Sequence, residues 1–207
     1  SKFSPKNIKA IIAEVGGIRK KTETVLLAEF FFIKNIKIVN APKETKNIWW
    51  LIEIIKVIEK FLIHTERALN GRYDAWNKEN NSRLALIILL DQMTRNMFRG
   101  SPKSFSGDEF ALSLSMNSIK SNHLEIEESM AKRIFILMPL MHSEDIKIQN
   151  FSIDYFKRYT NKKTLFYAKR HREIIREFGR FPHRNNIYGR PSTKDEIKFL
   201  KKNSSYF

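Results

Sequence analysis

Cysteine is absent from the 207-residue chain, and no hydrophobic run is long enough to cross a bilayer. The lack of cysteine excludes disulfides and thiolate metal ligands, and it fits a reducing compartment. A spanning helix needs about 20 apolar residues, whereas the longest apolar run, Leu84 to Leu90, holds seven. The basic N-terminal stretch also lacks the apolar segment of a secretory signal. We therefore expect a cytoplasmic protein without a membrane partner.

Glycine is scarce, with seven residues, and apolar residues recur at helical spacing along most of the chain. Both features favour helices over strands. The length suits one domain, 1–207, whose core needs no covalent staples. We predict an all-α fold, an antiparallel helical array of the bundle or short-solenoid type, with 1–22 as an N-terminal helical extension. The expected helices are 4–16, 23–33, 49–70, 81–98, 108–121, 127–138 (before Pro139), 143–159, 162–178 and 193–201.

The formal net charge is +16, and the excess of basic over acidic residues is unevenly distributed along the chain. Between Lys157 and Arg190 eleven lysines and arginines face only two acids. Such a stretch can bind a phosphate backbone, although no zinc-finger spacing, basic zipper or ribonucleoprotein motif accompanies it. RNA binding through 157–190 is therefore one alternative, and a solvated surface is the other.

A first group of polar residues follows the apolar run of Leu84 to Leu90, which indicates a buried helix. Asp91 and Arg95 are four positions apart and can pair on one helix face. Burying such charges costs several kcal/mol unless they pair. The residues either tie helices together or line a ligand pocket, which would include Asp91, Gln92, Arg95, Asn96 and Arg99.

A second group is Met141-His142-Ser143-Glu144-Asp145. Ser143 is a good helix N-cap, and acids in the following first turn favour the helix dipole. His142 is not explained in this way. A histidine beside two carboxylates can act as a general base, whereas the spacing matches no zinc signature.

A third group lies between 178 and 190. Gly179 suits a left-handed helix end, and Thr193 with Glu196 forms a capping box. The loop between them has no acid from 178 to 194 and collects cations. Arginine binds carboxylates or phosphates in a bidentate way, so the loop is either solvated or bound to an anion. Its candidate ligand-binding residues are Arg180, Arg184, Asn185 and Arg190, beside His183.

The strings NGRYDAW (70–76), LALIILLDQMTRNMFRG (84–100), LMPLMHSED (137–145), FGRFPHRN (178–185) and IYGRPST (187–193) resemble the bacterial family called domain of unknown function 924. The resemblance covers about 25–200. It implies a fold similar to tetratricopeptide-like domains and assigns no role to any residue. The chain has Met93-Thr94 where the family has Phe-Pro, and apolar residues near Ile54 replace an acid. If that acid belongs to a site, the site here is altered.

Taken together, the residues indicate a pocket that binds a small anionic ligand, such as a phosphorylated metabolite, without a metal or cofactor. Arg95, Arg180 and Arg184 would hold the anion, and Asp91 would orient Arg95. Proton transfer would fall to His142 or His183 with Glu144, in hydrolysis or phosphoryl transfer. The alternatives are a non-catalytic module that binds a protein partner, and RNA binding.

Overall fold

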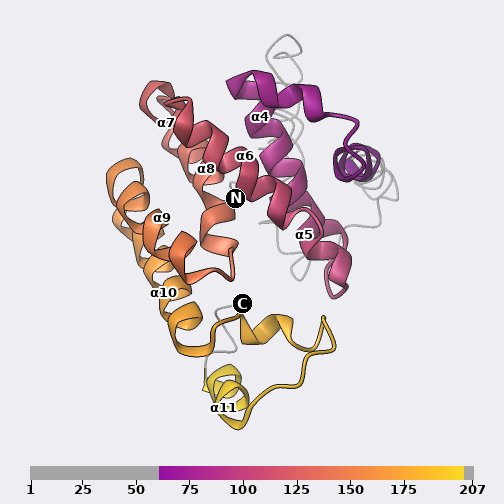
Figure 1. Cartoon of the computed structure of the whole chain (residues 1–207), viewed down its shortest axis with the longest axis vertical. Helices are drawn as coiled ribbons and strands as arrows, with labels where there is room; N and C mark the ends of the chain where they lie inside the picture. The colour runs from indigo at the N-terminus through magenta and orange to yellow at the C-terminus, as the bar shows by residue number, and fades with distance from the viewer. Residues whose placement is uncertain (1–60, 203–207) are drawn as a thin grey trace, which may run out of the picture. The chain divides into compact units, whose positions relative to one another are not determined.

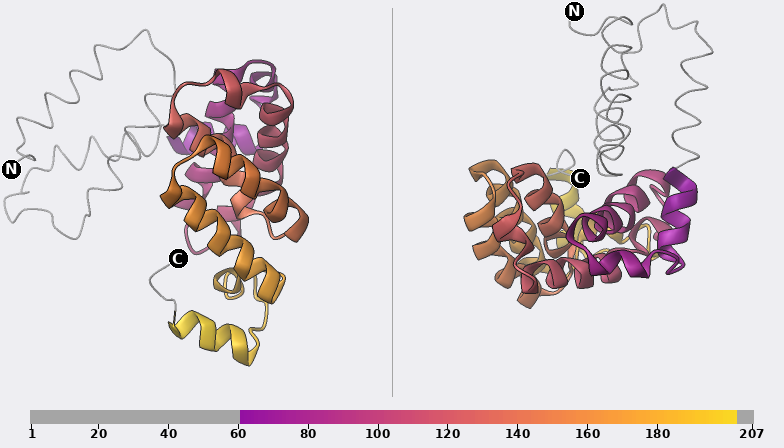
Figure 2. Two further views of the ribbon diagram at one scale, coloured as in Figure 1. Left: turned by 90° about the vertical axis from the view of Figure 1, so that its left-hand side faces the viewer. Right: turned by 90° about the horizontal axis from the view of Figure 1, so that it is seen from above.

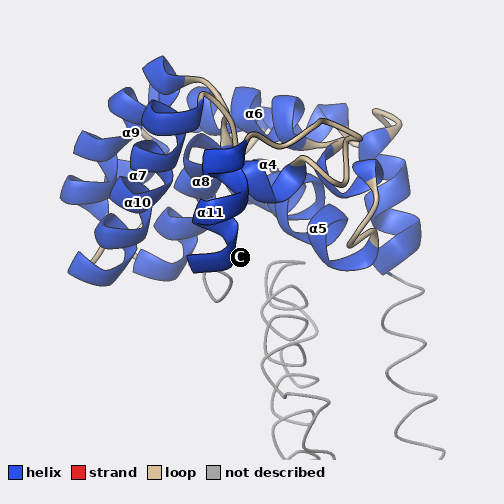
Figure 3. Ribbon diagram, turned by 90° about the horizontal axis from the view of Figure 1, so that it is seen from below, coloured by secondary structure: helices blue, strands red, loops and turns tan. Residues whose placement is uncertain are grey.

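The computed structural model describes residues 61–202. Expectations for the preceding residues lie outside this part of the chain: the helices 4–16 and 23–33, the first residues of helix 49–70, the extension 1–22 and the replaced acid near Ile54. Within 61–202 all regular structure is helical, as Figure 3 shows, which confirms the all-α prediction. The single domain over 1–207 and the tetratricopeptide-like character stay predictions.

The described part of the chain begins with a helix over 61–69 and continues through helices of varied length. In chain order the α-helices are α4 (Asn80–Ile87), α5 (Thr94–Met97), α6 (Asp108–Lys120), α7 (His123–Ile126), α8 (Met130–His142), α9 (Ile146–Tyr159), α10 (Lys162–Phe178) and α11 (Lys194–Lys202). The shorter elements are the 3-10 turns η2 (Asp74–Lys78), η4 (Pro102–Phe105) and η5 (Pro182–Arg184), and the π-helical segment η3 (Ile88–Met93).

Helices α8, α9 and α10 follow one another in the chain and pack side by side, and α8 also packs on α6 and α4 (Figures 1 and 2). Links of two or three residues join α8, α9 and α10, so each helix meets the next after a short turn. The core between them is aliphatic, with fully buried side chains that include Leu84, Leu86, Ile87, Leu114, Ile136, Leu137 and Phe156.

The predicted helix 81–98 is one helical path of three segments, α4, η3 and α5. Its apolar part is buried on all sides, as expected. It begins at Asn80, one residue before the predicted start, and no side chain caps it; the Ser82 hydroxyl donates to the Trp76 carbonyl at 2.9 Å. The π-helical segment widens the turn that carries Asp91, and such segments occur frequently at functional sites.

Helix α8 passes through Pro139 and ends at His142, so the predicted end at residue 138 is wrong. Proline removes one helical hydrogen bond. Ile136, Leu137 and Leu140 are fully buried around it, and this burial offsets the loss. The extra turn places His142 at the end of a helix and not in a free loop.

Ser143 is not the N-cap of the next helix. Asp145 takes that position, and its carboxylate accepts from the Lys147 amide at 2.7 Å. Ser143 accepts from the Asp145 amide at 3.2 Å. Glu144 therefore lies before helix α9, not in its first turn, and its carboxylate is left to contact other parts of the fold.

Two predicted helix ends are confirmed. Gly179 ends α10 with φ of 69°, a left-handed conformation in which glycine meets no steric penalty. Thr193 and Glu196 form the capping box of α11: the Glu196 amide donates to the Thr193 hydroxyl at 3.2 Å, and the Thr193 amide donates to the Glu196 carboxylate at 2.7 Å.

Candidate functional site

The centre of the polar residues is Asp91, which lies in η3 and is fully buried. Its Oδ1 is 2.7 Å from Nδ1 of His142 and 3.0 Å from Nη1 of Arg95. The side-chain amide of Gln92 donates to Oδ2. The predicted pair of Asp91 and Arg95 is thus confirmed, and a histidine from helix α8 joins it.

Burial by itself raises the pKa of Asp91. Arg95, His142 and the Gln92 hydrogen bond together lower it by more than burial raises it, so the net pKa lies below its usual range. The carboxylate is therefore ionised and can only accept hydrogen bonds. It follows that Nδ1 of His142 carries a proton and donates, and that in the neutral form of the ring the lone pair lies on Nε2. The His142 side chain is 16% exposed.

Asp108, in the first turn of α6, is shared by two arginines. Its carboxylate lies 2.8 Å from Arg95 and 3.2 Å from Arg184. The preceding Gly107 makes this position possible, because a Cβ at residue 107 would lie only 2.3 Å from the Leu90 carbonyl oxygen. Only glycine allows α6 to start this close to η3, and this approach brings Asp108 to Arg95.

Arg184 is the most deeply placed cation of the site, with 5% of the residue exposed. Its guanidinium lies between two aromatic rings, 4.5 Å from the centroid of Phe105 and 4.7 Å from that of Phe181. One nitrogen donates to Asp108, and another donates to the His142 carbonyl at 2.9 Å. Arg184 thereby connects η5 to the end of α8 and to α6.

Glu144 and Arg190 form a bidentate pair with oxygen–nitrogen distances of 2.9 and 3.1 Å. The same carboxylate accepts from the Phe181 amide at 2.9 Å. Burial raises the pKa of Glu144, but the Arg190 and Phe181 hydrogen bonds and nearby Arg184 lower it more, and the net pKa is lowered. Glu144 is thus a charged acceptor that ties the 178–190 loop to the start of α9.

Two further histidines lie near His142. The ring of His171, on α10, has its centroid 6.3 Å from that of His142, and its Nδ1 contacts the Tyr167 carbonyl at 2.8 Å. Burial, together with His142 and Arg184, lowers the pKa of His171 to about 4. Burial, followed by Arg184, lowers the pKa of His183 to about 3. Both rings are neutral at pH 7.

Seven of the residues that the sequence analysis selected form one network of contacts, His183 lies beside it, and the others lie outside it. The assembled residues are Asp91, Gln92, Arg95, His142, Glu144, Arg184 and Arg190. Arg99 is exposed beyond the end of α5, and Asn96 is half-buried on that helix. Arg180 makes a bidentate pair with buried Glu196 at 2.7 and 2.9 Å, and Asn185 donates to Ser192 at 3.1 Å.

Sequence reasoning did not select Asp108, His171 or the aromatic pair around Arg184. In the sequence Asp108 is an acid at the start of a predicted helix, which is a common position for acids and does not indicate a functional site. His171 lies in a basic amphipathic helix, and its sequence gives no signal that separates it from the neighbouring lysines and arginines. Buried Gln149 was also missed: its amide donates to the carbonyls of Met141 and Ser143 at 2.7 and 2.8 Å and holds the end of α8 that carries His142.

Within residues 61–202, no group of three or more histidines, aspartates or glutamates is arranged to hold a metal ion. None of the helices in that range is long and apolar enough to span a bilayer.

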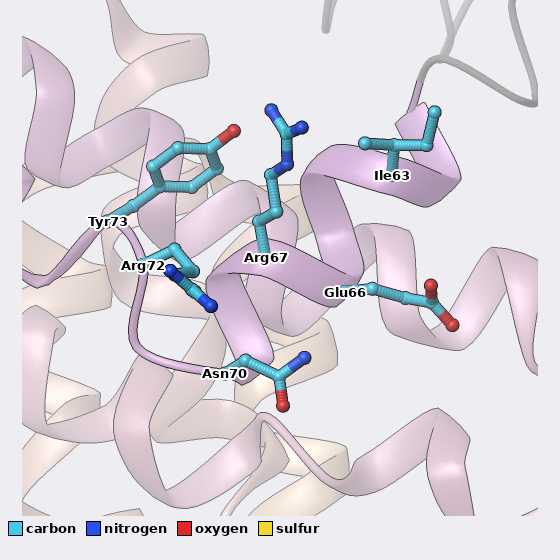
Figure 4. A pocket seen from close by; sticks show the side chains of 6 residues that line it. All are labelled: Ile63, Glu66, Arg67, Asn70, Arg72 and Tyr73. Atoms are coloured by element: carbon cyan, nitrogen blue, oxygen red, sulfur yellow. The ribbon is translucent and has the colours of Figure 1, made fainter.

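An open concavity of about 640 Å³ lies away from this network, around Ile63, Glu66, Arg67, Asn70, Arg72 and Tyr73 (Figure 4). None of its lining residues belongs to the network around Asp91.

The model of a family described as a bacterial protein of unknown function (DUF924) matches residues 29–204. The chain belongs to this family. The resemblance inferred from the five motifs is thereby confirmed over nearly the same range. The charged network of Asp91, His142, Glu144 and Arg184 lies inside three of those motifs, so the DUF924 strings are the segments that this fold brings together.

A solved structure is similar to this DUF924 chain. It is a protein of unknown function from Agrobacterium tumefaciens, 29% identical, with a TM-score of 0.69. The match covers 88% of this chain and 100% of that chain. No curated protein matches the chain. The comparisons therefore support the family and the helical fold, and the function has to be argued from the site.

Proposed function

We propose that the residues around Asp91 form a site that binds a small anionic ligand, with Asp91 and His142 as its proton-transfer pair. The observation that carries the proposal is the 2.7 Å contact between Oδ1 of Asp91 and Nδ1 of His142. A carboxylate in this position orients the imidazole and stabilises its protonated form. The lone pair on Nε2 is then available to accept a proton from water or from a hydroxyl group.

The arginines supply the charge that would attract an anion. Arg95 and Arg190 keep 18% and 27% of their side chains exposed, and a carboxylate partner holds each of them in place. A guanidinium has five donor N–H groups, and the Nε groups of Arg184 and Arg190 have no hydrogen-bond partner among the described residues. A phosphate or carboxylate is the class of ligand that fits such donors.

The reaction class that fits these groups is hydrolysis or phosphoryl transfer. His142 would take a proton from the attacking water or hydroxyl and return it to the leaving oxygen. The arginines would stabilise the negative charge that develops on the ligand. His183, the other histidine proposed from the sequence for proton transfer, has its pKa lowered to about 3 by burial and by Arg184, so it is a weaker base than a histidine of ordinary pKa.

One observation favours a second candidate function, a non-catalytic module that binds a protein. That reading expects the arginines to be paired within the fold, and Arg95, Arg184 and Arg190 each contact a carboxylate. In that case the network holds α6, α8 and the 178–190 loop together, and ligand binding would not depend on it. The two candidates differ in what Arg190 does.

The test is a thermal-shift panel of inorganic phosphate, nucleoside phosphates, sugar phosphates and short carboxylates. A ligand at 100 times its Kd stabilises the folded state by about 2.7 kcal/mol, which corresponds to a rise of about 5–10 °C for a protein of this size. Arg190→Ala should abolish the rise, whereas Arg176→Ala, which breaks an exposed pair with Glu173, should not. His142→Gln should keep binding and lose turnover of the same ligand.

Two results would refute the proposal. One is a panel in which no anion shifts the melting temperature, and the other is a shift that survives in Arg190→Ala. Arg190→Lys keeps the charge and serves as the second variant if the alanine variant does not fold. It should bind the ligand more weakly, because lysine cannot form the bidentate contact.

A further inference from the structure

The outer face of α10 carries a basic and aromatic surface that neither the core nor the charged network explains. Phe166 is 54% exposed and Tyr167 is 41% exposed. The apolar side of the same helix, with Ala168, Ile174 and Ile175, is buried against the neighbouring helices. Phe166 lies on the opposite side of the helix, and Tyr167, seven positions before Ile174, lies at the edge of the buried side. Both rings remain in part open to solvent.

Cations surround these rings at helical spacing. Lys162 and Lys163 precede Phe166 by four and three positions, and Lys169 and Arg170 follow it by three and four. Residues three and four apart are neighbours on a helix surface. All four are exposed, so Phe166 lies in the centre of a cationic ring of side chains. Figure 2 shows α10 beside α9 at the surface of the described chain.

Most of the lysines of this surface are not used by the fold. Four lysines are exposed and form no ion pair with any residue in 61–202: Lys162, Lys163 and Lys169 on α10, and Lys157 at the adjacent end of α9. The nearby acid Glu173 is already engaged by Arg172 and Arg176. The surface thus combines uncompensated positive charge with two accessible aromatic rings.

We propose that this surface, formed by Lys157, Lys162, Lys163, Phe166, Tyr167 and Lys169, binds single-stranded nucleic acid. The lysines would contact the phosphates, and Phe166 and Tyr167 would stack on unpaired bases. A duplex fits less well, since its bases are stacked on one another and are not available to the rings. An anionic membrane also fits less well, because an interfacial helix needs a broad apolar face and this face exposes two large apolar side chains.

The site is independent of the network around Asp91, so the two proposals fail separately. The first experiment is fluorescence anisotropy of the full chain with labelled single-stranded RNA and DNA of about 12 nucleotides, a length within the usual range of single-strand sites. Binding should weaken steeply from about 50 to about 200 mM salt, with a log–log slope of about 0.7 for each phosphate contacted. A duplex of the same sequence should bind more weakly.

Two double variants separate stacking from charge. Phe166→Ala with Tyr167→Ala should lower single-strand affinity about tenfold or more and leave the salt slope nearly unchanged. Lys163→Gln with Lys169→Gln should reduce the slope by about 1.4. The matched controls are Ile126→Ala with Met130→Ala, which removes two other exposed apolar side chains, and Lys120→Gln with Lys201→Gln, which removes the same charge elsewhere.

The expected result is weaker binding in the two α10 variants and little change in the two controls. Equal loss in α10 variants and controls would overturn the proposal, because it would mean that net charge or general surface properties drive association. Absence of single-strand binding at low salt would also overturn it. So would binding only to vesicles that contain phosphatidylserine, which would assign the surface to a membrane.

Discussion

Asp91 and His142 lie 51 positions apart in the chain and meet at 2.7 Å between Oδ1 and Nδ1. The contact joins the π-helical segment η3 to the last residue of α8. A fully buried carboxylate is thus hydrogen-bonded to a histidine and ion-paired with an arginine, Arg95. Because the carboxylate is ionised and can only accept, Nδ1 of the ring is the donor in this contact.

Replacing Asp91 by asparagine should destabilise the protein. The change removes the buried negative charge that Arg95 and His142 face, and breaking a buried pair costs roughly 3–5 kcal/mol. The melting temperature should then fall by about 10 °C or more. Asp154→Asn on α9 is the control, because that carboxylate is exposed. Equal effects of the two substitutions would show that the network contributes nothing beyond surface charge.

The low pKa of Asp91 also predicts an acid dependence. Burial raises this pKa, but Arg95 and His142 lower it by a larger amount, so the net value is below the usual range. Asp91 thus contributes stability above the unfolded-state pKa of about 3.9, which is lost as the pH falls through the folded value. Urea midpoints below about pH 4 should fall less steeply in Asp91→Asn than in the wild type. Parallel curves would contradict the assignment.

His171 predicts a second pH dependence in a different window. Burial lowers the pKa of His171 to about 4, whereas the unfolded value is about 6.5. Below pH 6.5 the unfolded chain takes up a proton that the folded chain excludes, so stability falls as the pH drops from about 6.5 towards 4. His171→Gln should flatten part of that decline. His183, whose pKa burial lowers to about 3, should contribute a similar part in its own variant.

Proton resonances of the imidazole rings give the direct check on His171. Its signal should not titrate between pH 5 and 8 in the folded protein, because the ring stays neutral there. A midpoint near 6.5 would show that the ring is solvated and that burial does not lower its pKa.

Gly107→Ala should disrupt the start of α6. The new Cβ would lie 2.3 Å from the Leu90 carbonyl oxygen, so helix and π segment have to separate, at a cost typical of overpacking, about 1–3 kcal/mol. Asp108 would move with the helix, away from Arg95 and Arg184. Ser113→Ala, at an exposed position of the same helix, should be neutral or stabilising. A stable Gly107→Ala variant would show that the approach of α6 to η3 is not tight.

Arg184→Lys tests the aromatic sandwich. Lysine keeps the charge but cannot stack a planar group between Phe105 and Phe181 while donating to Asp108 and to the His142 carbonyl. We expect the melting temperature to fall by several degrees, and the ring of His142 to show changed chemical shifts. Arg176→Lys, at an exposed position of α10, should change neither. Wild-type stability in Arg184→Lys would mean that only the charge of residue 184 matters.

Features that depend on near neighbours in the chain could be predicted from the sequence. The helical class follows from apolar spacing, the pair of Asp91 and Arg95 from a separation of four, and the ends at Gly179 and Thr193 from backbone conformation and capping. Each of these depends on interactions within one or two helical turns. The family match rested on motifs that are themselves short.

The assembly of the site was decided by tertiary structure. Pro139 signalled a helix end, but packing around Leu140 carries α8 on to His142. Asp145, and not Ser143, is the N-cap of α9, so Glu144 lies before the helix and pairs with Arg190. Asp108 reaches the arginines only because Gly107 lets α6 approach η3. Local preferences of about 1 kcal/mol yield to the larger free energy of burying whole helix faces, and distant charges pair only after that packing is complete.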